Sequence, residues 1–409
     1  MKLCLLTTSY PTWHEAPEQI IKGKFVHDMA KYLARAGVEV HVVTQHEPGT
    51  DAYQEKDGVR IHRFHYFFGR YETLTRGAGI PENIKRLRNK LLVPLYVASL
   101  IVTAHRLIKK HGIGIVNAHW GFPTGYIGLL LKKVTGTRLV TTLYGAELFP
   151  ILAGKHGSIR GLLKSALVGA DALAGISAET VGAAGSISGR DDIRLIPDGI
   201  DMEYYVPGAR DEELLGRYNC GGKRVIFFTG RMVERKGHRF LVEAMARVKE
   251  RGLDVKLLLG GNGPLFAELK ELRSRLQVED VVEMPGFLPE EELVSILQSA
   301  DLHVLPSCVD ANGDTEGSAT AAFEAMACGT PAIVSRIGGN IGAIEEGKGA
   351  CYFEAGNSIE LAEKIVSLFT DGALMEQNRK EARKFVQEHY SWERSISKYL
   401  TLIDGATSR

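Results

Sequence analysis

The sequence predicts an α/β fold built from two doubly wound parallel sheets. Short runs rich in Val, Ile and Leu, each followed by a longer amphipathic pattern, recur along all 409 residues, and such runs are typical of parallel strands buried on both faces. The alternation begins afresh after residues 196–208, which are rich in Pro, Gly and Asp, as an interdomain connector would be. We therefore expect two domains facing a central cleft, at residues 1–196 and 197–387.

The first domain should alternate buried strands with helices. Helical patterns are expected at residues 23–36 and 84–111, between strand-like runs. The strands are expected at residues 3–7, 38–44, 59–64, 113–117, 138–143, 172–176 and 193–196.

The second domain repeats this pattern, and a final helix at about residues 388–409 is expected to pack back onto the first domain. Ligands of doubly wound domains bind at the carboxyl ends of the strands, so motifs that carry chemistry should follow strands directly. The strands are expected at residues 224–229, 255–260, 281–284, 302–306 and 332–335.

The composition, 44% hydrophobic and 24% charged, is that of an ordered soluble protein. Five scattered cysteines without Cys-x-x-Cys spacing indicate neither a disulfide framework nor a zinc site, and they favour a reducing compartment. The first apolar run is too short for a signal peptide, and the run at residues 91–104 is too short to span a bilayer. We expect a cytoplasmic protein without a transmembrane segment.

The first strong motif is TGRMVERKGHRF at residues 229–240, directly after the first strand of the second domain. Arg231 and Lys236 lie on a loop flanked by Gly230 and Gly237 that leads into a helix. Two cations and free backbone N–H groups at the end of a strand suit a diphosphate. The alternative is a solvated charged loop, which is our interpretation of the neighbouring residues Glu234, Arg235 and Arg239.

The second motif is GDTEGSATAAFEAMACGTP at residues 313–331. Ser318 is expected to cap a helix, with Glu316 just before it and Glu324 nearly two turns inside. Free N–H groups at the helix start would face an anion, and each carboxylate would accept hydrogen bonds from sugar hydroxyls. The alternative is one glutamate that favours the helix dipole and one surface glutamate, but the small residues between them leave room for a ligand.

These motifs together resemble the retaining glycosyltransferases of family four, which have the two-Rossmann-domain fold called GT-B. The pairing G-R-x-x-x-x-K-G with Glu, seven residues and Glu, then PAIVSRIGG, carries the resemblance. Further similar segments run in order along the chain: TTSYPTW and GKFVHDMAKYLARAGVEVHVVT, IPDGIDMEYYVP, LGGNGPLFAEL, PGFLPEEELVSILQSADLHVLPS and FVQEHYSWERSISKYLTLI. Members that act in exopolysaccharide or lipid-linked glycan synthesis are the expected relatives.

The resemblance implies a role for individual residues. Arg231, Lys236 and Glu316 would act on the diphosphate and the donor sugar, and His119, in NAHWGFPTG, would contact the sugar near the reacting carbon. Glu324 would bind the ribose. The remaining implied donor-binding residues are Gly23, Gly230, Gly286, Phe287, Gly317, Ser318, Ala319 and Thr320, with Gly286 and Phe287 beside the base.

Two departures from the family pattern affect these expectations. Where the family often has His-Gly-x-Asp, this chain has Tyr144 and Glu147 in LYGAEL, which bears on how the acceptor is held. After PAIVSRIGG the family often continues Ile-Pro-Glu, whereas Gly342 takes the acidic position here.

Residues 84–112 combine an apolar segment with basic residues at both ends. Such a segment suits an anionic membrane surface and a lipid-linked acceptor, although a helix packed within its own domain is the favoured alternative. The charge distribution keeps the membrane hypothesis open, because residues 1–200 carry an excess of nine positive charges and the rest an excess of eight negative charges.

The resemblance implies retaining transfer of a sugar from a UDP-sugar or GDP-mannose to a hydroxyl of a glycan or lipid-linked acceptor. No protein nucleophile is evident, which fits front-face attack in which the departing phosphate oxygen takes the acceptor proton. Asp-x-Asp does not occur in the sequence, so we expect no essential metal, no other cofactor and no nucleic-acid partner.

Three alternatives remain at this point. A nucleotide-sugar epimerase or hydrolase on the same scaffold would act on the donor alone, and a sugar-binding module would not catalyse at all. A dinucleotide-dependent dehydrogenase is disfavoured because GGNGPL lacks the last glycine of G-x-G-x-x-G.

Overall fold

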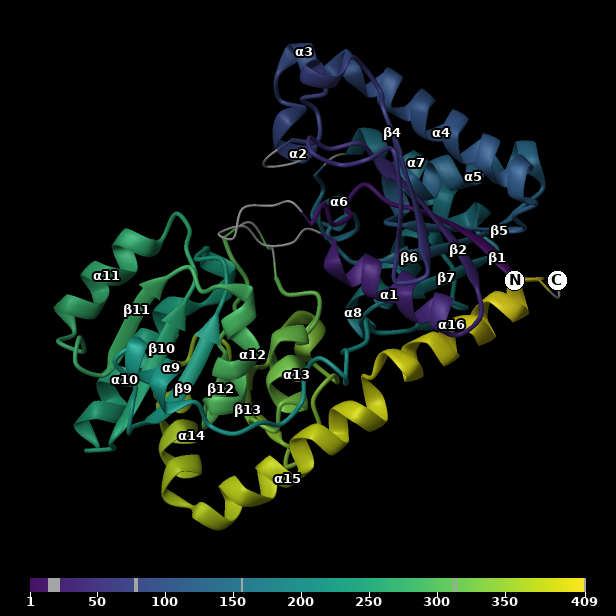
Figure 1. Ribbon diagram of the computed structural model, residues 1–409. Coiled ribbons are helices and arrows are strands. Elements are labelled where there is room, and N and C mark those ends of the chain that lie inside the picture. Colours follow the sequence, from purple (N-terminus) through teal and green to yellow (C-terminus); the bar gives the residue numbers. More distant parts are fainter. Residues whose placement is uncertain (14–22, 77–79, 156, 312, 314, 408–409) are drawn as a thin grey trace. The chain divides into compact units, whose positions relative to one another are not determined.

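A computed structural model describes residues 1–13, 23–76, 80–155, 157–311, 313 and 315–407 (Figure 1). The chain divides into two compact units. The first comprises Met1–Ile176, Thr180–Ile196 and Ser395–Arg409, and the second comprises Ser177–Glu179 and Pro197–Arg394.

An eight-stranded sheet forms the middle of the first unit, in the order β3-β4-β2-β1-β5-β6-β7-β8. Neighbouring strands are parallel except for β3 and β4. Strand β3 was not predicted, because its residues are polar and partly exposed and form no apolar run. The strands are β1 (Lys2–Leu6), β2 (Glu39–Gln45), β3 (Tyr53–Lys56), β4 (Val59–Phe64), β5 (Ile115–His119), β6 (Arg138–Leu143), β7 (Ala172–Gly175) and β8 (Arg194–Leu195).

Helices cover this sheet, and the side chains of α4, α5 and α7 share one apolar core with β1, β5 and β6. The last helix also belongs to this unit: the Tyr399 hydroxyl hydrogen-bonds to Asn117, and it lies 2.7 Å from the Thr142 hydroxyl. The helices are α1 (Lys24–Arg35), α2 (Ile80–Asn83), α3 (Leu87–Lys90), α4 (Leu92–His111), α5 (Tyr126–Thr135), α6 (Phe149–Leu152), α7 (Gly157–Gly169), α8 (Ala178–Ser188) and α16 (Trp392–Thr407).

The helix expected at residues 84–111 is divided into α3 and α4, which meet at Leu91. The segment Leu87–His111 is long and apolar enough to cross a bilayer by length and composition alone, a test that core helices of soluble proteins also pass. Only 28% of its apolar stretch is buried within the structure. The buried residues of α4 form a single stripe in the domain core, so one face of the helix packs within its own domain, as the favoured interpretation expects, and the rest is not fully covered.

A six-stranded, fully parallel sheet forms the middle of the second unit, in the order β11-β10-β9-β12-β13-β14. This is the 3-2-1-4-5-6 order of a Rossmann fold, which confirms the predicted fold class. The short edge strand β14 was not predicted. The strands are β9 (Arg224–Thr229), β10 (Val255–Gly260), β11 (Val282–Gly286), β12 (Leu302–Leu305), β13 (Ala332–Ser335) and β14 (Ala350–Phe353).

Helices alternate with the strands of the second unit, and α10 buries its apolar face in the core through Leu241, Met245 and Val248. They are α9 (Glu212–Arg217), α10 (His238–Glu250), α11 (Phe266–Arg275), α12 (Glu290–Ser299), α13 (Thr320–Ala327), α14 (Ser358–Thr370) and α15 (Gly372–His389).

Each sheet has one point where the order of its strands reverses. In the first unit this point lies between β1 and β5, and in the second it lies between β9 and β12. Open α/β sheets bind their ligands at the carboxyl ends of the strands beside such a reversal point. The loops after β9 and β12 are the two motifs that the sequence singles out.

Candidate functional site

The loop after β9 brings cations to the reversal point of the second unit. Lys236 ends a 3-10 turn at Glu234–Lys236, and Gly237 follows with φ +66°. A Cβ on Gly237 would lie 1.8 Å from the carbonyl oxygen of Pro306, so only glycine lets this loop approach the end of β12. Arg231 is exposed and has no ion pair among the described residues, which leaves its guanidinium available to an anion.

The loop after β12 contributes a buried carboxylate, Glu316, to the same place. Its Oε1 atom lies 3.0 Å from Lys236 Nζ and 3.0 Å from an Nη atom of Arg235. Arg235 was interpreted as a solvated charge, and that interpretation is wrong, because its guanidinium faces Glu316 rather than solvent alone. Arg239, by contrast, is 65% exposed and pairs with Glu243 on its own helix.

The start of α13 differs from the prediction. The helix begins at Thr320, and Ala319 stands at its N-cap without a side-chain hydrogen bond, so Ser318 is not the cap. Within the described structure, the N–H groups of Gly317, Ser318 and Ala319 donate no hydrogen bond. Three free donors before a helix start form a binding place for an anion.

The two glycines at the end of PAIVSRIGG lie against the backbone of Glu316 and Gly317. Gly339 N–H donates to the carbonyl of Glu316 at 3.0 Å. A Cβ on Gly339 would lie 2.1 Å from the Gly317 carbonyl oxygen, so a larger residue would push the turn away. Gly339 thus helps to position the backbone of Glu316.

Glu324, the second glutamate, lies half-buried on α13 and is not a plain surface residue. Its Oε1 accepts a hydrogen bond from the Tyr205 hydroxyl at 2.9 Å. Tyr205 comes from the connector segment, and its carbonyl in turn accepts from Arg383 at 2.7 Å. Sequence analysis did not identify Tyr205, because nothing in its spacing links it to α13.

The other predicted donor-binding residues lie along the same edge of the sheet. Gly230 follows β9 directly, and Gly286 ends β11 with φ +89°. The Gly286 carbonyl accepts from Gly261 N–H at 2.6 Å, and Phe287 beside it is half-buried. These residues therefore share the carboxyl edge with Arg231 and Glu316.

In the first unit, His119 is the last residue of β5, at the point where the strand order reverses. Its ring is fully buried, and burial lowers its pKa to about 3, so the imidazole is neutral at pH 7. Nδ1 lies 2.7 Å from the Tyr144 hydroxyl, whereas Nε2 has no partner among the described residues. The unengaged Nε2 is thus available to a hydrogen-bonding ligand.

Glu147 takes a structural role in the segment that departs from the family pattern. Its Oε1 accepts from the N–H groups of Tyr144 at 3.2 Å and Gly121 at 3.3 Å. Desolvation raises the pKa of this carboxyl, and the amide hydrogen bonds oppose that rise. Glu147 thereby holds the loops that present His119 and Tyr144.

Gly23, the remaining predicted residue, precedes α1 with φ +70°. A Cβ there would lie 2.4 Å from the carbonyl oxygen of Ser9, so this position admits only glycine. Much of the loop between them, residues 14–22, lies outside the described part of the chain. The close approach of α1 to the loop after β1 is nevertheless fixed by Gly23.

Comparison with known proteins agrees with this architecture. The family model described as "Glycosyltransferase Family 4" matches residues 23–204, and that described as "Glycosyl transferases group 1" matches residues 216–385. The chain is similar to N-acetyl-alpha-D-glucosaminyl L-malate synthase of Bacillus anthracis, with 24% identity over 98% of this chain and 97% of that protein.

Two further proteins are similar to this chain. A GDP-mannose-dependent alpha-(1-6)-phosphatidylinositol monomannoside mannosyltransferase of Mycolicibacterium smegmatis is 25% identical over 73% of this chain and 78% of its own length. The structure of Anabaena HepE in complex with UDP has a TM-score of 0.75 at 19% identity and covers 98% of this chain and 100% of that chain, a likeness of fold. The two family models together span both units, and this chain belongs to glycosyltransferase family four, whose members use nucleotide sugars.

Proposed function

We propose that the protein transfers a hexose from a UDP-sugar or GDP-mannose, with retention at the anomeric carbon, to a hydroxyl of a glycan or lipid-linked acceptor in glycoconjugate synthesis. The observation that carries the proposal is the cluster at the reversal point of the second sheet. Lys236 and Arg235 flank Glu316 there, beside the free N–H groups of residues 317–319.

The diphosphate of the donor is the ligand that this cluster suits best. Negative charge on the leaving diphosphate grows as the glycosidic bond breaks, so Arg231, Lys236 and the free amides stabilise the transition state more than the ground state. Arg235 joins them as a third cation that the sequence did not single out. Glu316 balances the two cations in the absence of donor and, as the resemblance implies, holds the transferred sugar.

The remaining roles follow the family resemblance. Glu324 binds the ribose, with Tyr205 fixing the direction of its carboxylate, and Gly286 and Phe287 lie beside the base. A neutral His119 contacts the sugar as a hydrogen-bonding group without adding positive charge to a developing oxocarbenium ion. Front-face attack, with the departing phosphate oxygen as the base, requires neither a protein nucleophile nor a metal at the diphosphate.

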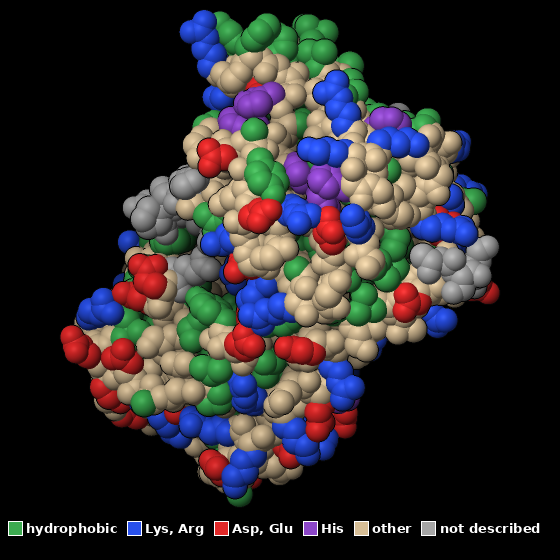
Figure 2. Space-filling view, turned by 45° about the vertical axis from the view of Figure 1, so that its right-hand side comes forward, with side chains coloured by type: hydrophobic (Ala, Val, Ile, Leu, Met, Phe, Trp, Pro, Cys, Tyr) green, Lys and Arg blue, Asp and Glu red, His purple; other side chains and the backbone are tan. Residues whose placement is uncertain are grey.

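A lipid-linked acceptor is supported by the surface of α3 and α4. Leu87, Leu91 and Phe68 are 75%, 73% and 76% exposed, and the Thr73–Asn89 hydrogen bond ties the loop of Phe68 to α3. Figure 2 shows hydrophobic side chains gathered at the top of the view, where Figure 1 labels α3, with Lys and Arg side chains beside them. An apolar patch with a basic rim suits the anionic inner face of a membrane.

Thermal unfolding with a panel of nucleoside diphosphates tests the donor site. The matching diphosphate should raise the melting temperature, since a ligand at about a hundred times its Kd stabilises by about 2.7 kcal/mol. Lys236→Ala should lose this shift and the transfer activity, whereas Lys223→Ala, an exposed lysine paired with Asp254 before the same strand, should keep both. Normal shifts in Lys236→Ala would refute the site, and epimer formation from donor alone would favour the epimerase.

A further inference from the structure

Two groups of His and Glu side chains in the first unit have the ligand atoms that a metal ion needs. One is Glu39, His41 and His111, and the other is His46, His65 and Glu72. In each group, the ligand atoms lie within 4.8 Å of one another. Neither group takes part in the glycosyl transfer proposed above, and the cysteine pattern gave no sign of them.

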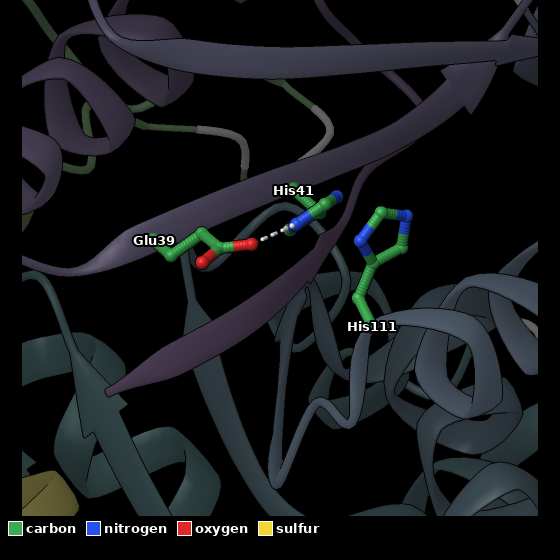
Figure 3. A group of neighbouring side chains, drawn as sticks. All are labelled: Glu39, His41 and His111. Carbon is green, nitrogen blue, oxygen red and sulfur yellow. Dashed lines mark hydrogen bonds and ion pairs between the residues drawn. The ribbon is translucent and has the colours of Figure 1, made fainter.

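The first group is already neutralised by the protein. Figure 3 shows Glu39 and His41 on β2 and His111 at the end of α4. Glu39 Oε1 also bonds to Arg60, and Lys2 lies 3.7 Å from Oε2. Two fixed cations on the only carboxylate compete with any divalent ion, so this group carries no metal site.

The second group, which we call the His46 cluster (His46, His65 and Glu72), lacks such cations. No lysine or arginine pairs with Glu72 among the described residues. Glu72 is buried, and its Oε1 accepts from the N–H groups of Tyr66 at 2.7 Å and Phe67 at 3.2 Å. The backbone therefore fixes one oxygen and presents the other, Oε2, to the two imidazoles.

The two histidines reach Glu72 from adjacent strands. Gln45 and Phe64, the last residues of β2 and β4, are partners in register, so His46 and His65 follow them side by side. His46 Nδ1 lies 3.4 Å and His65 Nδ1 3.1 Å from Glu72 Oε2. Ligands of a tetrahedral zinc ion, at 2.0–2.2 Å from the metal, are separated by about 3.3–3.6 Å, so the two distances to Glu72 are close to those of a coordination shell, and the third pair of ligand atoms lies within 4.8 Å.

The hydrogen bonds of His46 decide which nitrogen is the ligand. Nε2 lies 3.0 Å from the carbonyl oxygen of Thr50, which only accepts, so Nε2 carries the hydrogen. In a neutral His46 the lone pair is then on Nδ1, facing a carboxylate oxygen. The Nδ1 lone pair and the carboxylate oxygen repel each other at 3.4 Å unless a proton or a metal ion lies between them. The Thr50 carbonyl on Nε2 is also the kind of partner that a metal-bound histidine usually has on its other nitrogen.

We infer that the His46 cluster binds one divalent transition-metal ion of the Zn²⁺ class through His46 Nδ1, His65 Nδ1 and Glu72. Two imidazoles and one carboxylate are a ligand set that such ions accept, with the fourth position left to water. The ion ties the ends of β2 and β4 to the loop between His65 and Glu72, which carries Phe67 and Phe68.

Titration of the full-length chain with Co²⁺ and then Zn²⁺ tests the site. The protein should carry no polyhistidine tag and should first be dialysed against a chelator. We expect one equivalent of Co²⁺ with the visible absorption of a nitrogen- and oxygen-ligated tetrahedral ion, no thiolate band, and displacement by Zn²⁺. Zn²⁺ should also raise the melting temperature.

Two variants assign the ligands, and one serves as the control. His65→Ala, whose side chain is 49% exposed, and Glu72→Gln, which keeps an oxygen for the Tyr66 and Phe67 amides, should each weaken binding by at least about tenfold. Glu39→Gln, in the first group, should leave it unchanged. The inference is overturned if the unmodified chain binds no stoichiometric metal, if both variants bind normally, or if Glu39→Gln abolishes binding. Circular dichroism of the metal-free variants excludes misfolding as the cause.

Discussion

Glu316 Oε1 lies 3.0 Å from the ammonium nitrogen of Lys236, so a buried carboxylate and a cation meet between the loops that follow β9 and β12. Because Arg235 shares the same oxygen, Glu316 competes with any anionic ligand for both cations. Removing the carboxylate should therefore free both cations for an anionic ligand, whereas removing Lys236 takes away one of the cations that would bind it.

Glu316→Gln should lower transfer at least about 10²–10³-fold, the usual effect of losing a group that acts on the transition state. Its affinity for the nucleoside diphosphate should be unchanged or higher, because the cations lose their internal counter-ion. Isothermal titration beside a transfer assay measures both quantities. Weaker diphosphate binding in this variant would contradict the assignment.

Arg235→Ala should weaken diphosphate binding about tenfold or more, since a hydrogen bond to a charged group contributes roughly 1.5–3 kcal/mol. Arg239→Ala removes a cation four residues along, from an exposed pair with Glu243, and should bind normally. Equal diphosphate affinities in the two variants would show that Arg235 does not bind the diphosphate.

Acid should destabilise the protein through its buried neutral histidines. Burial lowers the pKa of His303 to about 3, below its ordinary value of 6.5, so between these pH values the unfolded chain binds the proton and the folded chain does not. Stability therefore falls as pH drops below about 6.5, by up to about 1.4 kcal/mol per pH unit for each such group. His119 behaves in the same way.

His303→Leu checks this pH dependence, because it removes the titrating group from β12 and keeps an apolar side chain beside Phe227 and Phe228. Melting temperatures between pH 7 and pH 4 should fall less steeply than in the unmodified chain. His105→Leu, which changes a half-exposed histidine, is the matched control. Identical slopes in all three proteins would show that His303 does not cause the acid sensitivity.

The double variant Leu87→Glu, Leu91→Glu should reduce binding to vesicles that contain anionic lipid, because it places carboxylates in the apolar patch of α3. Ile359→Glu changes an exposed hydrophobic residue outside this patch, 51% exposed on α14, and should bind as before. Cosedimentation at two salt concentrations separates the apolar from the electrostatic contribution to vesicle binding, because salt weakens only the electrostatic one. If the double variant binds vesicles as well as the unmodified chain does, the membrane proposal is wrong.

The continuous apolar runs predicted most of both sheets, because strands buried on both faces leave that pattern directly in the sequence. The polar edge strand β3 left no such pattern. The residues Arg231, Lys236 and Glu316 could be named because they follow strands, whereas the pairing of Arg235 with Glu316 depends on how two loops fold toward each other. The His46 cluster was missed for a similar reason, since its members are joined by strand register and not by spacing.

Helix α16 returns the chain to the unit in which it began, and this has a consequence for synthesis. Tyr399 reaches Asn117 and Thr142 only after residues 197–394 have been translated. The first unit therefore completes its fold only after the whole second unit has been synthesised, although all of its own strands are translated before residue 197.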